Sequence, residues 1–346
     1  MIIHSHSLIA FLKQCRENGL GGFSQVIIPR LSLKNSADSF LSSQFPPETY
    51  HLDGYRPVDP LRLLFYFPRE QVFPAAANSG KRLIVGVKAC DLKALLLLDK
   101  ALMGPDFVDP NYRYWRENSI IVSSDCTAIA PTCHCTLVGG QPFATRGFDL
   151  NLTRIGDEYL LSTGSPVGEE LLNLIRSQAE LRSPTEEDRK RIQNQQNQMI
   201  ERLQEQNRPY ERTINAARLR EAPLEKWLRD AKPCIGCGGC TNICPTCYCL
   251  ILNDESKGTD FVKVRSTDSC QWHGYARVAG GASPRPKMVE RFRNRYLCKF
   301  DYMPSNFDEL GCTGCGRCTE VCAAEIDFRE VLRAALSQTQ ADSVNN

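Results

Sequence analysis

The sequence predicts a chain in two parts: an α/β domain with a mixed sheet over residues 1–182, and a mainly helical, cysteine-rich domain over residues 223–346. Three observations lead to this prediction. Short apolar runs of strand length alternate with helical patterns in the first half. A polar segment with few apolar residues separates the halves at residues 183–222. Twelve of the 17 cysteines then follow, between Cys234 and Cys322.

The composition is ordinary for a globular protein apart from its cysteines. Of the 346 residues, 42% are apolar and 24% charged, and the net charge of +2 predicts neither a nucleic-acid nor a membrane partner. No apolar run reaches the roughly 18 residues that a membrane span needs. The first residues lack a basic stretch and a cleavage site, so we expect no signal peptide and a cytoplasmic location. In that reducing compartment, 17 cysteines indicate metal binding rather than disulfides.

The α/β prediction for residues 1–182 rests on five apolar runs and one helix. The helix is expected from Asp91 onward, with Asp91 as its N-cap. Because strands alternate with helical segments, the sheet should be partly parallel. The expected strands are QVIIP at 25–29, LLFYF at 63–67, RLIVGVKAC at 82–90, SIIVSSDC at 119–126 and EYLLST near Tyr159.

The polar segment 183–222 is predicted to be a linking helix. Ser183-Pro184 followed by Glu186 and Glu187 is a favourable helix start. The sparse apolar residues form one narrow contact stripe: Ile192, Met199, Ile200 and Leu203. A disordered low-complexity linker is the alternative that the composition leaves open. The last ten residues, SQTQADSVNN, should be frayed.

Two identical cysteine motifs mark the second domain. Each has the spacing C-x2-C-x2-C-x3-C, which is typical of bacterial ferredoxins, where the fourth cysteine binds the other [4Fe-4S] cluster. A short loop can cap three iron corners but cannot wrap around the whole cubane. Zinc is the alternative, but it explains neither the third nor the fourth cysteine of each motif. The predicted ligand sets are Cys234, Cys237, Cys240 and Cys322, and Cys312, Cys315, Cys318 and Cys244.

The surroundings of these motifs refine the prediction. Glycines within the motifs let the backbone approach a cluster and point N–H groups at its sulfur atoms. Between Cys244 and Cys312, segments such as 287–300 have a helical pattern. This favours the helical type of two-cluster domain over the compact β-hairpin type. The glycines are Gly236, Gly238, Gly239, Gly314 and Gly316.

A third group of cysteines lies in the first domain. Cys90 and Cys126 each end a predicted strand, and Cys133 and Cys135 follow in a loop. Parallel strands place their carboxyl ends at one edge, where α/β sheets have their sites. We therefore expect these four cysteines to hold one further cluster. The alternative is that they are buried structural thiols.

The remaining cysteines carry less information. Cys247, Cys249 and Cys270 are either ligands of a further centre, neighbours of the first cluster, or structural thiols. Cys15 and Cys298 have no partner pattern and are predicted to be free thiols.

The basic run 285–299 is expected to place positive charge near anionic clusters rather than to bind nucleic acid. His273 and Trp272 are expected to pack or to support the metal ligands from behind rather than to act in catalysis. We find no nucleophile–base pair, Walker loop or dinucleotide fingerprint.

Several segments resemble one known family. These are CGGCTNICPTCYC, GCTGCGRCTEVC, GVKACDLKAL, VSSDCTAIAPTCHCT and GFDLNLTRIGDEYLL. Together they are similar to the β subunit of cytosolic NiFe hydrogenase/sulfur reductases and to the A subunit of anaerobic sulfite reductase. The resemblance covers about residues 50 to 330. Two positions depart from the family pattern: Ala323 replaces a proline, and Cys298 stands where a histidine is expected.

The resemblance implies an electron-transfer subunit with several [4Fe-4S] clusters. It implies a partner subunit that carries flavin and exchanges electrons with NAD(P)H, and a terminal redox subunit of the hydrogenase, sulfite/sulfur reductase or heterodisulfide-reductase type. FAD and NAD(P)H are expected only on the partner. Two other hypotheses remain. A stand-alone enzyme would bind substrate at a cluster in the N-terminal domain. A structural metal protein would bind nucleic acid, which the balanced charge disfavours.

Overall fold

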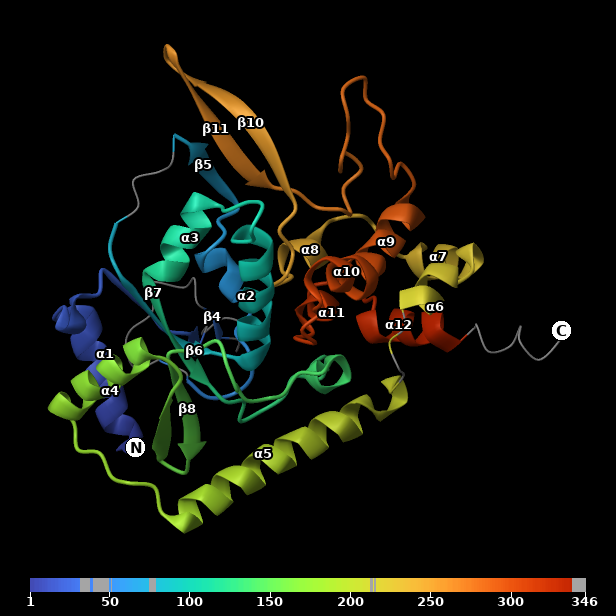
Figure 1. The fold of residues 1–346 in the computed structure, drawn as a ribbon. Helices are drawn as coiled ribbons and strands as arrows, with labels where there is room; N and C mark the ends of the chain where they lie inside the picture. Colours follow the sequence, from blue (N-terminus) through green and yellow to red (C-terminus); the bar gives the residue numbers. More distant parts are fainter. Residues whose placement is uncertain are drawn as a thin grey trace.

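The computed structural model describes residues 1–31, 38–39, 50, 52–74, 79–211, 214 and 216–337. Figure 1 shows a sheet with helices on both faces, a helical part beside it, and one long helix, α5, that runs along both. Residues 212, 213 and 215 of the predicted linking segment lie outside the described residues. So do residues 338–346, where fraying was predicted.

The first part is built on a mixed six-stranded sheet with the order β1-β9-β8-β7-β6-β2. Neighbouring strands from β2 to β8 are parallel, whereas β9 is antiparallel to both β8 and β1. This confirms the predicted mixed sheet. The strands are β1 (Ile2–His4), β2 (Gln25–Ile27), β6 (Arg82–Val87), β7 (Ser119–Ser124), β8 (Leu150–Ile155) and β9 (Glu158–Thr163).

Helices cover both faces of the sheet, so β6 and β7 are buried along their whole length. Leu83 and Val122 face a core shared with helices α1 (Ser5–Glu17) and α4 (Pro166–Gln178). Ile84 and Ile121 face the opposite core, which contains apolar residues of α2 (Ala89–Leu102). Helix α3 (Pro110–Glu117) adds Tyr112 to that second core.

Two local predictions in this part are wrong. The run 63–67 is not a strand, because Leu61–Leu64 form a 3₁₀ turn whose apolar side chains pack beneath α2. A short apolar run alone cannot distinguish these two structures. Helix α2 begins at Ala89 with Lys88 as N-cap, so Asp91 lies in its first turn instead of capping it. Cys90 therefore lies on the helix, just beyond the strand.

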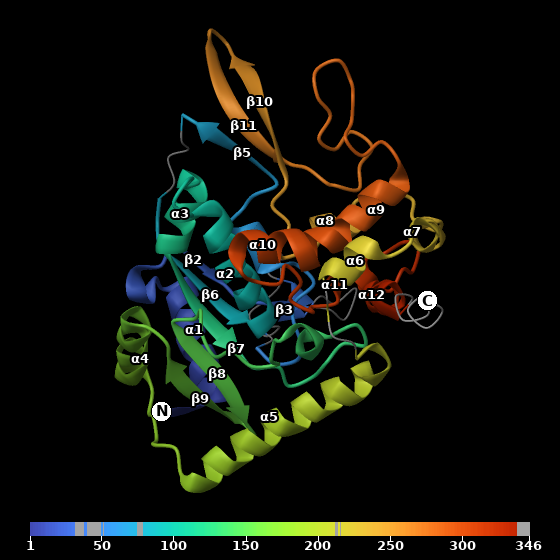
Figure 2. The ribbon, with the colours of Figure 1, turned by 45° about the vertical axis from the view of Figure 1, so that its right-hand side comes forward.

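The polar linking segment forms the predicted helix, α5 (Glu186–Asn207). Thr185 and Asp188 form a capping box at its start. Met199 and Leu203 of the predicted stripe are buried against the rest of the chain. Figure 2 shows α5 crossing from the strands β8 and β9 toward the helical part. Helices α6 (Ala216–Glu221) and α7 (Leu224–Ala231) follow it.

The second part packs short helices around an aromatic core. Trp227, Phe292, Tyr296 and Phe328 are buried together, and the rings of Tyr296 and Phe328 stack at 4.6 Å. The predicted helix near residue 287 is α9 (Met288–Leu297), which continues through a π turn at Cys298–Tyr302. The other helices are α8 (Gly239–Asn242), α10 (Met303–Phe307), α11 (Arg317–Glu320) and α12 (Phe328–Ser337).

A β-hairpin that the sequence analysis missed extends from this part. Strands β10 (Leu250–Lys257) and β11 (Asp260–Thr267) are antiparallel, and β11 also pairs with β5 (Arg69–Phe73) of the first part. The hairpin and β5 stand above the sheet in Figure 1. A two-stranded pair, β3 (Arg30–Leu31) and β4 (Asp38–Ser39), completes the described strands. None of the helices in the described ranges is both long and apolar enough to cross a membrane.

Candidate metal centres

The second cysteine motif surrounds a cavity together with one cysteine of the first motif. Cys312, Cys315 and Cys318 come from the loop before and within α11, and Cys244 comes from the loop after α8. These four residues, which we call the second-motif set, were predicted from spacing alone. The structure places them around one cavity, and their role as ligands stays a prediction. His134, Arg295, Lys299 and Phe328 complete the wall.

A hydrogen-bond donor already faces a sulfur atom of this set. The backbone N–H of Gly314 donates to Cys312 Sγ at 3.4 Å. Thr246 Oγ1, whose hydroxyl donates to Gly311 O at 2.6 Å, lies 3.3 Å from Cys244 Sγ. Such bonds stabilise a thiolate and are one of the protein's means of setting a cluster potential. His134 Nε2 lies 3.7 Å from Cys312 Sγ. Burial lowers the pKa of His134 to about 4.

The four cysteines of the first domain line a second cavity. This N-terminal set consists of Cys90 from the start of α2, and of Cys126, Cys133 and Cys135 from the loop after β7. The convergence follows from the parallel strands β6 and β7, whose carboxyl ends share one edge. Burial raises the pKa of Cys126 to about 12 and that of Cys90 well above its ordinary value. Cys133 and Cys135 are buried, whereas Cys90 and Cys126 are partly exposed.

Cys315 lines both cavities, so the two sets are immediate neighbours. The loop of the second motif lies directly against residues 132–135: His134 N–H donates to Gly314 O at 2.8 Å. A Cβ on Gly314 would stand 2.4 Å from Cys135 Cα, and one on Gly316 would stand 2.4 Å from Thr132 O. Both glycines also have positive φ angles, of 69° and 75°. The close approach of two backbones therefore adds a second reason for glycine at these motif positions.

The first motif lies nearer the surface. Cys234 and Cys237 precede the short helix α8, Cys240 lies within it, and Cys322 follows α11. Helices α8 and α11 contact each other, and Gly239 would bring a Cβ within 3.7 Å of Val321. The contact brings the two motifs together, and the first-motif set of Cys234, Cys237, Cys240 and Cys322 stays a prediction. Cys237 is exposed, and Trp272 Nε1 donates to its carbonyl oxygen at 3.1 Å.

Buried cations stand beside these cysteines. Arg295 reaches Cys240 O at 3.5 Å, and Lys299 Nζ donates to Thr246 Oγ1 at 2.7 Å. Arg62 donates to Cys244 O at 3.1 Å. Each is buried, and within the described ranges none of the three has a carboxylate at ion-pair distance. A buried cation needs an anion nearby, and here the neighbouring groups able to carry negative charge are cysteine sulfurs.

The neighbouring cysteine sulfurs raise the pKa values of two of these cations, Lys299 and Arg295. Burial alone would lower the pKa of Lys299, but the sulfurs of Cys244, Cys247 and Cys298 outweigh it and raise that pKa. In the same way, Cys240 and Cys318 outweigh burial and raise the pKa of Arg295. Arg295 thus lies between the first-motif and second-motif sets. The basic run 285–299 places these side chains inside the protein, as expected, instead of on a nucleic-acid surface.

The cysteine sets fit clusters better than single ions. In the part of the chain that the structure describes, no three His, Cys, Asp or Glu side chains converge closely enough to hold one metal ion. The second-motif and N-terminal sets instead surround a cavity, each with four thiols and without a carboxylate in the wall. Four thiolates around a shared space are the ligand chemistry of an iron–sulfur cubane. The residues present therefore fit this group.

Some contributors could not be recognised from the sequence. Arg56 and Arg62 lie far from the motifs in sequence, yet Arg56 Nε donates to Cys315 O at 2.7 Å. Gln206 and Asn207 of α5 both donate to Cys133 O at 2.9 Å. No local pattern marks these residues. Cys298, for which no partner was predicted, lies close to Cys270 and Lys299. Cys15 is buried in the core of the sheet, away from the motifs.

The fold and these sets define a class of protein: one with a 4Fe-4S dicluster domain. A family model of that description matches residues 233–326. The chain is also 32% identical to the sulfhydrogenase 2 subunit beta of Pyrococcus furiosus over 295 residues, which is 81% of this chain and 84% of that protein. The chain therefore belongs to the family of the sulfhydrogenase beta subunits, as the resemblance implied, and is an iron–sulfur electron-transfer protein. No solved structure matches it.

Proposed function

We propose that the chain relays single electrons between two partner subunits through at least three [4Fe-4S] clusters, held by the first-motif, second-motif and N-terminal sets. The observation that carries this proposal is the shared wall between two four-cysteine cavities. A cluster supplies a one-electron carrier when bound. The chain's own residues hold the carriers close together and surround them with donors and cations.

The order of the sets supports a relay. The N-terminal set adjoins the second-motif set through Cys315. The second-motif set adjoins the first-motif set across Arg295, which responds to both Cys318 and Cys240. The first-motif set reaches the surface at the exposed Cys237. Ile235 and Trp272 are large apolar side chains exposed beside it. A cluster that reaches the surface among exposed apolar side chains is suited to electron exchange with a docked subunit.

The proposed partners follow from the family. The relative from Pyrococcus furiosus is named as one subunit of a sulfhydrogenase. We propose that one partner of this chain is a flavin-containing reductase that exchanges electrons with NAD(P)H. The other is a terminal redox subunit of the hydrogenase, sulfite/sulfur reductase or heterodisulfide-reductase type. Flavin and nicotinamide would then bind the partner only.

The test is an anaerobic metal count on the purified full chain, with electron paramagnetic resonance of its reduced form. Three clusters require at least about twelve iron and twelve acid-labile sulfide per chain. Cys312→Ser and Cys133→Ser should each remove about four of each. Coupled spins in the reduced sample would support neighbouring clusters. Zinc without sulfide, or cysteine variants that lose no iron, would overturn the proposal.

One observation favours the stand-alone enzyme as a second candidate. A pocket of about 350 Å³ adjoins the N-terminal set and is lined by Cys126, Asp125, Arg154 and Gln196. Asp125 accepts hydrogen bonds there from Thr153 and Asn151. A cluster behind this pocket would need an open iron position to bind substrate. Turnover of sulfite or polysulfide by the purified chain with a chemical reductant would favour this candidate over the relay.

A further inference from the structure

Four cysteines outside the three sets are brought together by tertiary structure. Cys247 and Cys249 lie in the loop that enters β10, Cys270 follows β11, and Cys298 follows α9. The hairpin register pairs Leu250 with Thr267, and Asp268 N–H donates to Cys249 O at 2.9 Å. The hairpin therefore brings the segments that carry Cys249 and Cys270 side by side.

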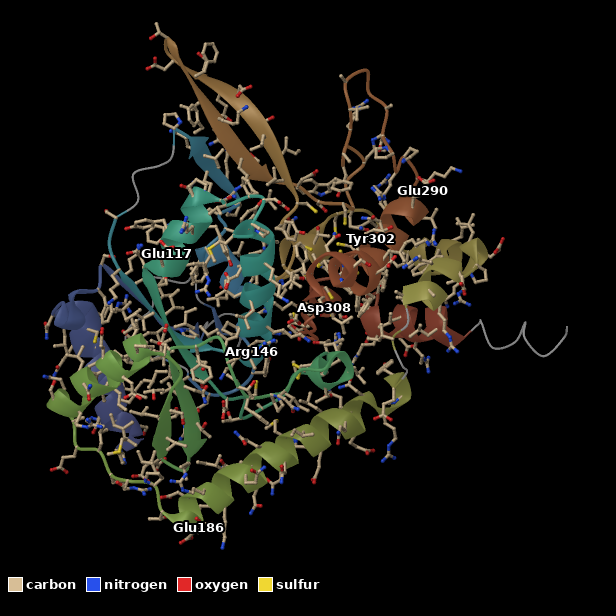
Figure 3. The ribbon with its side chains drawn as sticks, in the orientation of Figure 1. Glu117, Arg146, Glu186, Glu290, Tyr302 and Asp308 are labelled. Carbon is tan, nitrogen blue, oxygen red and sulfur yellow. The ribbon has the colours of Figure 1, made fainter. Side chains whose placement is uncertain are left out.

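Helix α9 joins this group from the other side. Gln271 Nε2 donates to Arg291 O at 2.8 Å, and Arg291 Nε donates back to Gln271 O at 3.2 Å. These two bonds fix the residue after Cys270 to α9. Cys298 lies seven residues after Arg291, which is two helical turns along the same face. Figure 3 shows sulfur atoms gathered near the helices of this part.

The neighbours of these thiols link the four segments. Cys249 has Cys270 and Cys298 among its charge neighbours, and Cys298 has Cys270. Cys247 lies next to Cys244 and near Cys249. Together with the hairpin register and the Gln271–Arg291 hydrogen bonds, these positions place the four residues, which we call the fourth set, in one region of the fold.

The fourth set repeats the pattern of the N-terminal set. That set consists of Cys133-x-Cys135 plus two cysteines from separate segments, Cys90 and Cys126. The fourth set consists of Cys247-x-Cys249 plus two cysteines from separate segments, Cys270 and Cys298. With it, Cys15 alone of the 17 cysteines is left outside a set, and Cys15 is a core thiol.

The surroundings of the fourth set are suited to an anion. Arg62 is 2% exposed, and its Nη1 has no hydrogen-bond partner among the described residues. Cys247 and Cys244 lie beside Arg62. Lys299 is also 2% exposed and lies beside Cys244, Cys247 and Cys298. Two buried cations without carboxylates require a buried negative group.

Hydrogen-bond donors also point at the fourth set. Gln271 Nε2 lies 3.4 Å from Cys270 Sγ, and Tyr275 Oη lies 3.9 Å from Cys249 Sγ. Donors to sulfur are a regular feature around ligating thiolates. The fourth set therefore has the surroundings of a metal site: two buried cations and two hydrogen-bonding side chains lie beside its thiols. No sequence motif predicts this site.

We propose that Cys247, Cys249, Cys270 and Cys298 hold a fourth iron–sulfur cluster of the [4Fe-4S] type. The proposal rests on the proposed function only in that the chain must be loaded with iron and sulfide. Cys247 adjoins Cys244 of the second-motif set. The fourth cluster would therefore branch from the middle of the relay toward the base of the β10–β11 hairpin.

The test uses the full chain, loaded anaerobically with iron and sulfide until uptake stops. Saturation is expected at about sixteen iron and sixteen sulfide per chain. Cys249→Ser and Cys298→Ser should each lose about four of each. Cys15→Ser, a buried thiol outside the sets, should lose none. Saturation of the unaltered chain at about twelve or fewer would overturn the proposal, even if a variant failed to fold. So would zinc in place of iron at this site.

A further variant separates failure of this proposal from failure of the proposed function. Cys312→Ser removes a ligand of the second-motif set and should lose about four iron whatever the fourth set does. If Cys312→Ser loses iron while Cys249→Ser and Cys298→Ser lose none, the fourth set alone is refuted. If none of the three loses iron, the relay itself is refuted. Mössbauer spectra of the samples would show whether the lost iron belonged to cubanes.

Discussion

Asp91 and Arg317 form a buried, bidentate ion pair that joins the two halves of the molecule. Arg317 Nη1 donates to Asp91 Oδ1 at 2.8 Å, and Nη2 donates to Oδ2 at 2.7 Å. Asp91 follows Cys90 of the N-terminal set, and Arg317 precedes Cys318 of the second-motif set. Burial would lower the pKa of Arg317, but Asp91 and Cys315 outweigh it and raise that pKa. The pair therefore fixes the two cavities relative to each other.

Asp91→Asn should destabilise the protein and loosen both cavities. The guanidinium of Arg317 would stay buried without its carboxylate, which costs about 3–5 kcal/mol. We expect a lower midpoint of thermal unfolding, measured by circular dichroism, and less iron per chain in both sets. Glu117→Gln is the control, because Glu117 pairs with Arg113 at the exposed surface and such pairs contribute about 1 kcal/mol or less. Equal midpoints for the two variants would contradict the role given to the pair.

Gly314→Ala should prevent the second-motif loop from packing against residues 132–135. The added Cβ would stand 2.4 Å from Cys135 Cα and 2.5 Å from His134 O, both backbone atoms. Gly22→Ala is a matched control, since Gly22 has the same φ of 69° and open space around it. The control should cost only the left-handed strain, about 1–2 kcal/mol. We expect Gly314→Ala to lose iron from two sets; iron loss equal to that of Gly22→Ala would show that the clash is relieved.

Lys299→Met should lower the reduction potential of the neighbouring clusters. Lys299 is a buried cation beside Cys244, Cys247 and Cys298, and positive charge favours the reduced, more negative state. Loss of about 1–2 kcal/mol of this interaction corresponds to about 50–100 mV for a one-electron couple. Redox titration followed by electron paramagnetic resonance would measure it. Lys190→Met, on the exposed face of α5, should leave all potentials unchanged. A potential that stays constant or rises in Lys299→Met would refute this role.

Asn207→Leu should release the loop of the N-terminal set. Asn207 is fully buried, donates to Cys133 O at 2.9 Å and accepts from Arg329 Nη1 at 3.1 Å. Its replacement removes both bonds, at a cost of about 2 kcal/mol, although Gln206 still donates to Cys133 O and Arg329 to Pro131 O. We expect selective loss of about four iron with the other sets retained. Asn197→Leu, on the exposed face of the same helix, is the control. Iron loss spread over all sets would mean that Asn207 supports the whole fold.

Much of the fold could be predicted because its signals are local. The strands around Leu83 and Ile121 are continuous apolar runs, and helix α5 carries its own capping box at Thr185. The strand prediction for 63–67 was wrong because a short apolar run has no periodicity that distinguishes a strand from a turn. The β10–β11 hairpin was missed because Leu250 and Ile251 remain exposed, and Val264 is the one apolar residue of the described hairpin strands that is buried.

The sequence by itself determined the two ferredoxin-type motifs, the parallel strands that lead to Cys90 and Cys126, and the family. These features follow from spacing and periodicity, which act over a few residues. Only the tertiary structure decided that Arg62 and Lys299 stand beside cysteines, that Asp91 pairs with Arg317, and that Cys298 joins Cys270. Such contacts form when distant segments are buried together and each buried charge must find a partner. No local pattern in the chain records that requirement.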